Sequence, residues 1–209
     1  MADDASHSAA NNDQHKTRLR KELRERRRAL TPTQQAHASA LVLRHLLQFP
    51  AFMRGSHIAL YIANDGEVDP APIAQQLWHM GKRCYLPVVH PGKNRELWFL
   101  EFTRNTSLIP NRFGIPEPDH RHAHKMAAHL LDIVLMPLVG FDRSGARLGM
   151  GGGFYDSTFA FKHHKPTGKP LLIGLAHSCQ EVELLSTDNW DIPLTAIATE
   201  KEVLQIAGS

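Results

Sequence analysis

A glycine-rich stretch from Arg147 to Asp156, RLGMGGGFYD, combines residue types that bind phosphate. Its glycines, Gly149 and 151–153, leave backbone N–H groups free to turn toward one point, and such a nest binds phosphate oxygens. The guanidinium of Arg147 can bind phosphate through paired hydrogen bonds. The carboxylate of Asp156 can hold Mg²⁺, which combines one or two carboxylates with phosphate oxygens. We therefore expect a ligand site here, with Arg147 and Asp156 as its catalytic residues.

The stretch matches neither of the common phosphate-binding motifs. Gly140 and Gly145 have the P-loop spacing, but Ala-Arg follows where Lys and then Ser or Thr are required. Phe154 stands where the dinucleotide-binding motif needs its third glycine. A tight turn with close packing is the structural alternative. Four glycines within five residues, flanked by a cation and a carboxylate, favour the ligand site.

A basic helix is expected near the start of the chain. The net charge is only +3, but the segment 16–28 holds eight Lys or Arg and two Glu. The leucines that share one helical face are Leu19, Leu23 and Leu30. Their spacing predicts a helix packed on a core. Its charges form a solvated face, a nucleic-acid patch, or a few cations, such as Lys16 and Arg20, reaching over a triphosphate.

Two acidic residues stand at places where a ligand could use them. Glu67 follows the apolar run 57–62, and open α/β sheets bind ligands beyond the carboxyl ends of their strands. Asp191, in TDNWDIPL, is a turn or cap residue unless a ligand recruits it. A metal site at His120, His122 and His124 is disfavoured, because no Cys or acidic cluster of known spacing accompanies them.

Apolar runs alternate with helical patterns along the rest of the chain. Strands are expected at 57–62, 83–89, 96–102, 132–137, 171–176 and 195–199. Helices are expected at 73–81, at 124–131, at 155–162, and after a Thr31–Gln34 capping box, with a stripe of Ala36, Ala40, Leu43 and Leu47. This predicts a single α/β domain with a largely parallel sheet flanked by helices on both faces and an N-terminal amphipathic helix. The run 96–102 breaks the alternation and is expected in a meander or at an edge.

The first fifteen residues are polar and acidic, without the basic start and apolar middle of a signal peptide. We expect 1–15 to be a disordered leader and 16–209 to be the domain. No run of about 18 apolar residues occurs, so we expect no transmembrane helix and a cytoplasmic protein.

Taken together, the chain resembles the 5-formyltetrahydrofolate cyclo-ligase family. The resemblance rests on K-x-x-L-R at 16–20, E-V-D at 67–69, G-I-x-E-P at 114–118, P-x-x-x-F-D-x-x-G-x-R-L-G-x-G-x-G-x-Y-D at 137–156, I-G-L-A at 173–176, Gln180, Asp191 and T-E at 199–200. It implies an ATP- and Mg²⁺-dependent cyclisation of 5-formyltetrahydrofolate to 5,10-methenyltetrahydrofolate, with release of ADP and phosphate. The formyl oxygen would be phosphorylated, and N10 would then displace the phosphate.

The resemblance also implies the roles of individual residues. It assigns ATP binding to Lys16, Arg20, Arg147, Leu148, Gly149, Met150, Gly151, Gly152, Gly153, Phe154 and Tyr155. It assigns folate binding to Glu67, Met150, Gly151, Gly152, Gly153 and Phe154. It assigns Mg²⁺ to Asp156 and Asp191. Met150 stands where many members have Tyr or Arg, Gly152 where some have Lys, and Phe154 where Tyr is frequent.

Two alternatives from other classes remain. The chain could be a nucleic-acid-binding protein that uses its basic helix, or a non-catalytic folate or nucleotide sensor, for which Met150 is the hint. We expect a monomer without nucleic-acid or membrane partners. A polyglutamate tail on the folate would suit a cationic surface.

Overall fold

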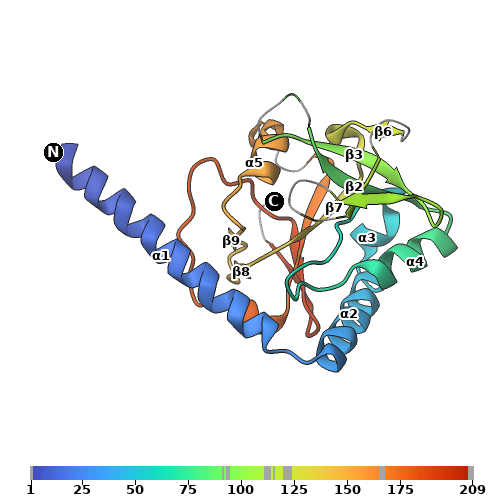
Figure 1. Cartoon of the computed structure of the whole chain (residues 1–209), viewed down its shortest axis with the longest axis horizontal. Helices are drawn as coiled ribbons and strands as arrows, with labels where there is room; N and C mark the ends of the chain where they lie inside the picture. The colour runs from blue at the N-terminus through green and yellow to red at the C-terminus, as the bar shows by residue number, and fades with distance from the viewer. Residues whose placement is uncertain are drawn as a thin grey trace.

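The computed structural model describes residues 2–90, 92, 95–110, 114, 116–119, 124–164 and 168–206, with side chains of the first helix from Asn12 onward. The expectations for Ile115, His120 and His122 lie outside these residues. Within them an eight-stranded sheet forms the centre (Figure 1). Its spatial order is β12 (Val203–Gln205), β11 (Ala196–Ala198), β10 (Leu171–Leu175), β7 (Ile133–Pro137), β1 (His57–Ala59), β2 (Arg83–Val89), β3 (Leu97–Phe102) and β6 (Lys125–Met126).

The central strands β11, β10, β7, β1 and β2 are parallel, as predicted, and β12, β3 and β6 add antiparallel edges. The parallel strands are buried on both faces, which explains why they read as continuous apolar runs. Ile58 of β1 pairs with Ile133 of β7, so the two strands that lead to the expected site residues are neighbours. Strand β3 pairs with β2 and is the expected meander.

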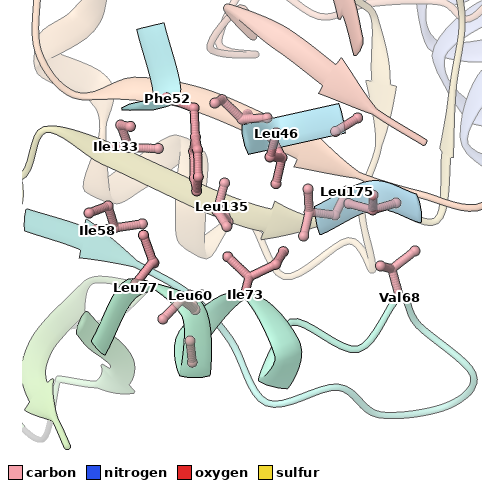
Figure 2. Close-up of a cluster of buried hydrophobic side chains, with 14 of the residues drawn as sticks. Leu46, Phe52, Ile58, Leu60, Val68, Ile73, Leu77, Ile133, Leu135 and Leu175 are labelled. Carbon is pink, nitrogen blue, oxygen red and sulfur yellow. The ribbon is translucent and has the colours of Figure 1, made fainter. Parts of the chain in front are cut away.

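Three helices, α2 (Pro32–Leu47), α3 (Pro50–Arg54) and α4 (Ala71–His79), pack against one face of the sheet. Figure 2 shows Leu46, Phe52, Ile73 and Leu77 from these helices meeting around Leu135 of β7. Short elements supply part of the other face, namely α5 (Phe154–Thr158), η1 (Ala128–Leu130) and η2 (Ala160–His163). The predicted fold class is therefore confirmed, although helices cover the two faces unequally.

The start of α2 was predicted correctly, but its buried face was not. Thr31 and Gln34 form the capping box. Ala36 and Ala40 are exposed, whereas the buried residues of α2 are Ala38, Ser39, Val42 and Leu46. Apolar residues occur on several sides of this helix, so periodicity alone admits two faces, and packing selects the one with Val42 and Leu46.

Two other helix predictions need correction. The segment 124–131 forms strand β6 and the 3-10 turn η1, because Met126 pairs with Phe99 at the edge of the sheet. The expected helix 155–162 is divided into α5 and η2 at Phe159, where ψ rises to 15°. In both cases tertiary contacts override local helix propensity.

Helix α1 (Ala2–Arg28) extends away from the body toward its N-terminus (Figure 1). It includes 12–15, so these residues are helical and not part of a disordered leader. Leu23 is buried against the hairpin of β8 (Gly140–Phe141) and β9 (Arg147–Leu148). The remaining elements are β4 (Leu108–Pro110), β5 (Pro116–Pro118) and η3 (Ser178–Gln180). No helix among the described residues is long and apolar enough to cross a membrane.

Leu23→Ala tests the docking of α1. Leu23 is fully buried, so this change is expected to lower the free energy of unfolding by about 2–5 kcal/mol. Urea denaturation followed by circular dichroism measures the effect. Leu184→Ala, at a side chain that is 77% exposed, is the matched control and should change stability by less than about 0.5 kcal/mol. Equal effects of the two changes would contradict the packing of α1.

Candidate active site

The predicted site residues gather at the carboxyl edge of the parallel sheet, next to β1 and β7. From β1 the chain builds β2 on one side, and β7, β10 and β11 extend the sheet on the other. The direction in which strands are added therefore reverses between β1 and β7. Such a topological switch point is the usual place for a ligand in an open α/β sheet. The turn with Glu67 follows β1, and the glycine-rich segment follows β7 through the β8–β9 hairpin.

The glycine-rich segment connects β9 with α5 as exposed backbone. Gly151 and Gly153 have φ of 89° and 66°, values that favour glycine. A side chain at Gly152 would begin 2.8 Å from the ring of Phe154, so glycine and phenylalanine fit each other here. Helix α5 has only five residues, so its dipole is small, and the binding of anions must rely on the backbone N–H groups and nearby cations.

Arg147 and Asp156 contact each other. Arg147 donates hydrogen bonds to a carboxylate oxygen of Asp156 and to the carbonyl of Ile192. The backbone N–H of Ile192 donates to the same Asp156 oxygen at 3.2 Å. The two residues singled out for chemistry are thus held together against the loop that follows η3.

Helix α1 brings two more cations to this place. Lys16 Nζ lies 2.6 Å from Asp188 Oδ2, and Arg20 Nε donates to the carbonyl of Gly149 at 2.9 Å. Lys16 and Arg147 line one cavity of about 240 Å³. The other residues that line it are Asn12, His15, Leu19, Leu148, Leu184, Leu185 and Ser186. The cavity therefore offers apolar and polar walls as well as two cations.

Asp191 lies in the same loop as Asp188. The Asp191 carboxylate accepts the Asp188 backbone N–H at 2.8 Å. Among the described residues, no group of three or more His, Cys, Asp or Glu could hold a metal ion. Asp156 and Asp191 supply hard oxygen donors of the kind that Mg²⁺ prefers, and their small number fits an ion that takes other ligands from phosphate and water.

Glu67 lines a second cavity, of about 430 Å³, beyond the end of β1. Its side chain is 12% exposed, lies 3.6 Å from Arg27 and accepts the Asn64 backbone N–H at 3.1 Å. Burial raises the pKa of Glu67 above its ordinary range, and Arg27 opposes this shift. Burial and the negative charge of Glu67 both raise the pKa of Tyr155, the second residue of α5, so this hydroxyl stays protonated close to the Glu67 carboxylate.

Arg27 is the site residue that the sequence analysis missed. The sequence singled out only Lys16 and Arg20 among the cations of this helix, but Arg27 is fully buried and donates to the carbonyls of Asp65 and Leu138 at 2.8 and 3.3 Å. Although burial opposes the shift, hydrogen bonds from Arg24, Arg28 and Arg27 hold the pKa of Asp65 below its ordinary value. The signal was present, because position 27 continues the spacing of Leu19 and Leu23.

Two further buried polar residues hold these loops. Asp142 accepts the N–H groups of Ser144 and Ala146, inside the β8–β9 turn, and that of Leu185 at 2.8 Å. It thereby joins the hairpin that carries Arg147 to the chain segment that leads to Asp191. Gln180, part of the family resemblance, donates to the carbonyls that follow β7.

A model of the 5-formyltetrahydrofolate cyclo-ligase family matches residues 12–200. The 5-formyltetrahydrofolate cyclo-ligase of Escherichia coli K12 is 42% identical over 181 residues, which are 87% of this chain and 98% of that protein. The enzyme of the same name from Haemophilus influenzae is 41% identical over 183 residues, covering 88% and 96%.

Solved structures agree. The 5,10-methenyltetrahydrofolate synthetase of Aquifex aeolicus superposes with a TM-score of 0.78 at 31% identity, covering 93% of this chain and 94% of that one. The synthetase of Mycoplasma pneumoniae gives 0.69 at 25% identity, covering 88% and 98%.

His177 gives the Glu67 turn a testable pH dependence. Burial lowers the pKa of His177, whose Nε2 lies 3.1 Å from the carbonyl oxygen of Gly66. As pH falls below about 6.5, the unfolded chain takes up a proton that the folded chain binds only at lower pH, so the free energy of unfolding should fall. Urea denaturation between pH 5 and 8 measures this. His177→Gln should flatten the profile, and the same change at exposed His37 should not; equal slopes would contradict the prediction.

Proposed function

Because the chain belongs to the 5-formyltetrahydrofolate cyclo-ligase family, we propose that it is an ATP-dependent enzyme that converts 5-formyltetrahydrofolate to 5,10-methenyltetrahydrofolate. The observation that carries this proposal is the grouping of Lys16, Arg20 and Arg147 around exposed glycine backbone. Cations and free N–H groups at one point are suited to a triphosphate. The Glu67 cavity lies at the same edge of the sheet and would take the folate.

The reaction requires the protein to align the formyl oxygen with the γ-phosphate and to neutralise the charge that develops. The formyl oxygen attacks the γ-phosphorus, and ADP leaves. The nitrogen N10 then attacks the formyl carbon, the carbon–oxygen bond breaks, phosphate leaves, and N10 loses its proton to solvent. Phosphorylation turns a poor leaving group into a good one, so no nucleophilic side chain is needed. Positioning and electrostatic stabilisation account for most of the catalysis in phosphoryl transfer.

Each residue takes a part that its position allows. Arg147 would bind phosphate oxygens while its contact with Ile192 keeps the guanidinium oriented. Lys16 and Arg20 would add charge from the other wall of the site. Asp156 and Asp191 would hold Mg²⁺, which supplies charge neutralisation for the phosphates when bound. The residues 149–155 would present backbone to the nucleotide and, at 150–154, to the folate.

Glu67 would recognise the folate. Its carboxylate is kept in place by Arg27 and by the Asn64 N–H, and it borders the larger cavity. A pterin presents N–H donors along one edge, and a buried carboxylate that is already oriented is a suitable acceptor for them.

Neither alternative is favoured by an observation. A nucleic-acid patch would need free cations on α1, but Arg24, Arg27 and Arg28 all contact Asp65. A sensor without catalysis would retain binding without turnover. Met150 is 58% exposed, so its side chain does not fill the site.

Turnover distinguishes these possibilities. Purified protein with 5-formyltetrahydrofolate and Mg²⁺ should produce methenyltetrahydrofolate absorbance and ADP only when ATP is added. Asp156→Asn is expected to lower kcat by about 100-fold or more, because it removes both a metal ligand and the partner of Arg147. Circular dichroism checks that the variant is folded. Absence of ATP-dependent product with folded wild-type protein would refute the enzyme, and unchanged turnover of the variant would remove Asp156 from the site.

Glu67→Gln tests the folate side. We expect KM for the folate to rise about tenfold or more, with KM for ATP nearly unchanged, because a charge-assisted hydrogen bond is lost. In the wild type, kcat/KM for the folate should fall as pH drops through the raised pKa of Glu67, at a higher pH than for an ordinary carboxylate. The Glu67→Gln variant should lack this pH-dependent fall in kcat/KM. Glu202→Gln, at a surface partner of Arg143, is the control. If the variant keeps this pH dependence of kcat/KM, Glu67 does not bind the folate.

A further inference from the structure

The cations of the nucleotide site are already bound to carboxylates or carbonyls of the same chain. Lys16 contacts Asp188 at 2.6 Å, and Arg147 contacts Asp156. The three cations Lys16, Arg20 and Arg147 face three carboxylates, those of Asp156, Asp188 and Asp191. The formal charges of these six side chains cancel, so a nucleotide that approaches Lys16 and Arg147 meets their carboxylate partners as well.

Asp188 differs from the other two carboxylates in its contacts. Asp156 accepts hydrogen bonds from Arg147 and from the backbone of Ile192, and Asp191 accepts the backbone N–H of Asp188. Within the residues that the structure describes, the Asp188 carboxylate contacts Lys16 alone. It is therefore not needed to shape its own loop, and no element of the family resemblance gives it a role.

We propose that Asp188 is a specificity-determining residue that makes nucleotide binding depend on Mg²⁺. This inference rests on the proposed function. A metal-free triphosphate must compete with Asp188 for Lys16 while it approaches two further carboxylates, which costs binding free energy. A nucleotide that carries Mg²⁺ has less negative charge and brings a cation for which these carboxylates are suited. Lys16 then exchanges the Asp188 carboxylate for a phosphate favourably only when the nucleotide carries Mg²⁺.

The ion pair is placed so that this exchange can matter. The Lys16 side chain is 13% exposed and that of Asp188 is 31% exposed, so the pair is screened less than one on an open surface. Lys16 also lines the cavity that contains Arg147. Asp188 thus competes with a phosphate for the same cation at the same place.

Isothermal titration calorimetry with ATP, once with Mg²⁺ and once with EDTA, tests the inference without relying on turnover. Asp188→Asn is expected to strengthen metal-free ATP binding about tenfold and to change binding of the Mg²⁺ complex by less than about threefold. Glu202→Gln, which breaks an exposed ion pair with Arg143, should behave as the wild type in both titrations. Unchanged or weaker metal-free binding by Asp188→Asn would overturn the inference.

A second pair of variants separates competition for Lys16 from the general loss of a negative charge. In a Lys16→Met background, Asp188→Asn should alter metal-free affinity by less than about twofold, since the partner is gone. A full tenfold gain in that background would also overturn the inference. If wild-type protein binds no ATP with Mg²⁺, both the proposed function and this inference fail. If the wild type binds ATP and turns over, but Asp188→Asn has the same ratio of ATP affinities with Mg²⁺ and with EDTA as the wild type, only the inference fails.

Discussion

The buried guanidinium of Arg27 is the contact on which both parts of the site depend. It joins α1 to the turn that carries Asp65 and Glu67 and to the carbonyl of Leu138, where the chain leaves β7. A buried charge is tolerated only with such a set of partners, and loss of one partner leaves the others unpaired in a medium of low polarity. The same side chain therefore fixes α1, orients Glu67 and joins the segments that follow β1 and β7.

Helix α1 sets the separation of the two cavities. Lys16 and Arg27 are eleven residues apart on one helix, which corresponds to about 16 Å along its axis. Lys16 lines the cavity that contains Arg147, while Arg27 contacts the turn that carries Asp65 and Glu67. Under the proposed function, the nucleotide and the folate would have to meet between these two cavities, because phosphoryl transfer needs the γ-phosphate and the formyl oxygen in contact. A rigid helix is a suitable way to keep the two cavities at a constant distance.

Local sequence patterns, namely apolar runs and a helix capping box, predict much of this fold. Continuous apolar runs identified the buried parallel strands, and Thr31 with Gln34 identified the start of α2. Distant partners were not predictable. Arg27 contacts a residue 38 positions away, and Lys16 contacts one 172 positions away, so nothing near them in the sequence marks them as paired. The strand at Lys125–Met126 likewise exists because β3 offers an edge, although its own sequence suits a helix.

The contact between Gly152 and Phe154 has an evolutionary consequence. Any side chain at position 152 would start within 2.8 Å of the Phe154 ring, so the ring must turn away before such a side chain can be accommodated. The two positions are therefore epistatic: the effect of a lysine at 152 depends on which residue, in which rotamer, stands at 154. A lysine at 152 is therefore expected to require a different residue, or a different rotamer of phenylalanine, at 154.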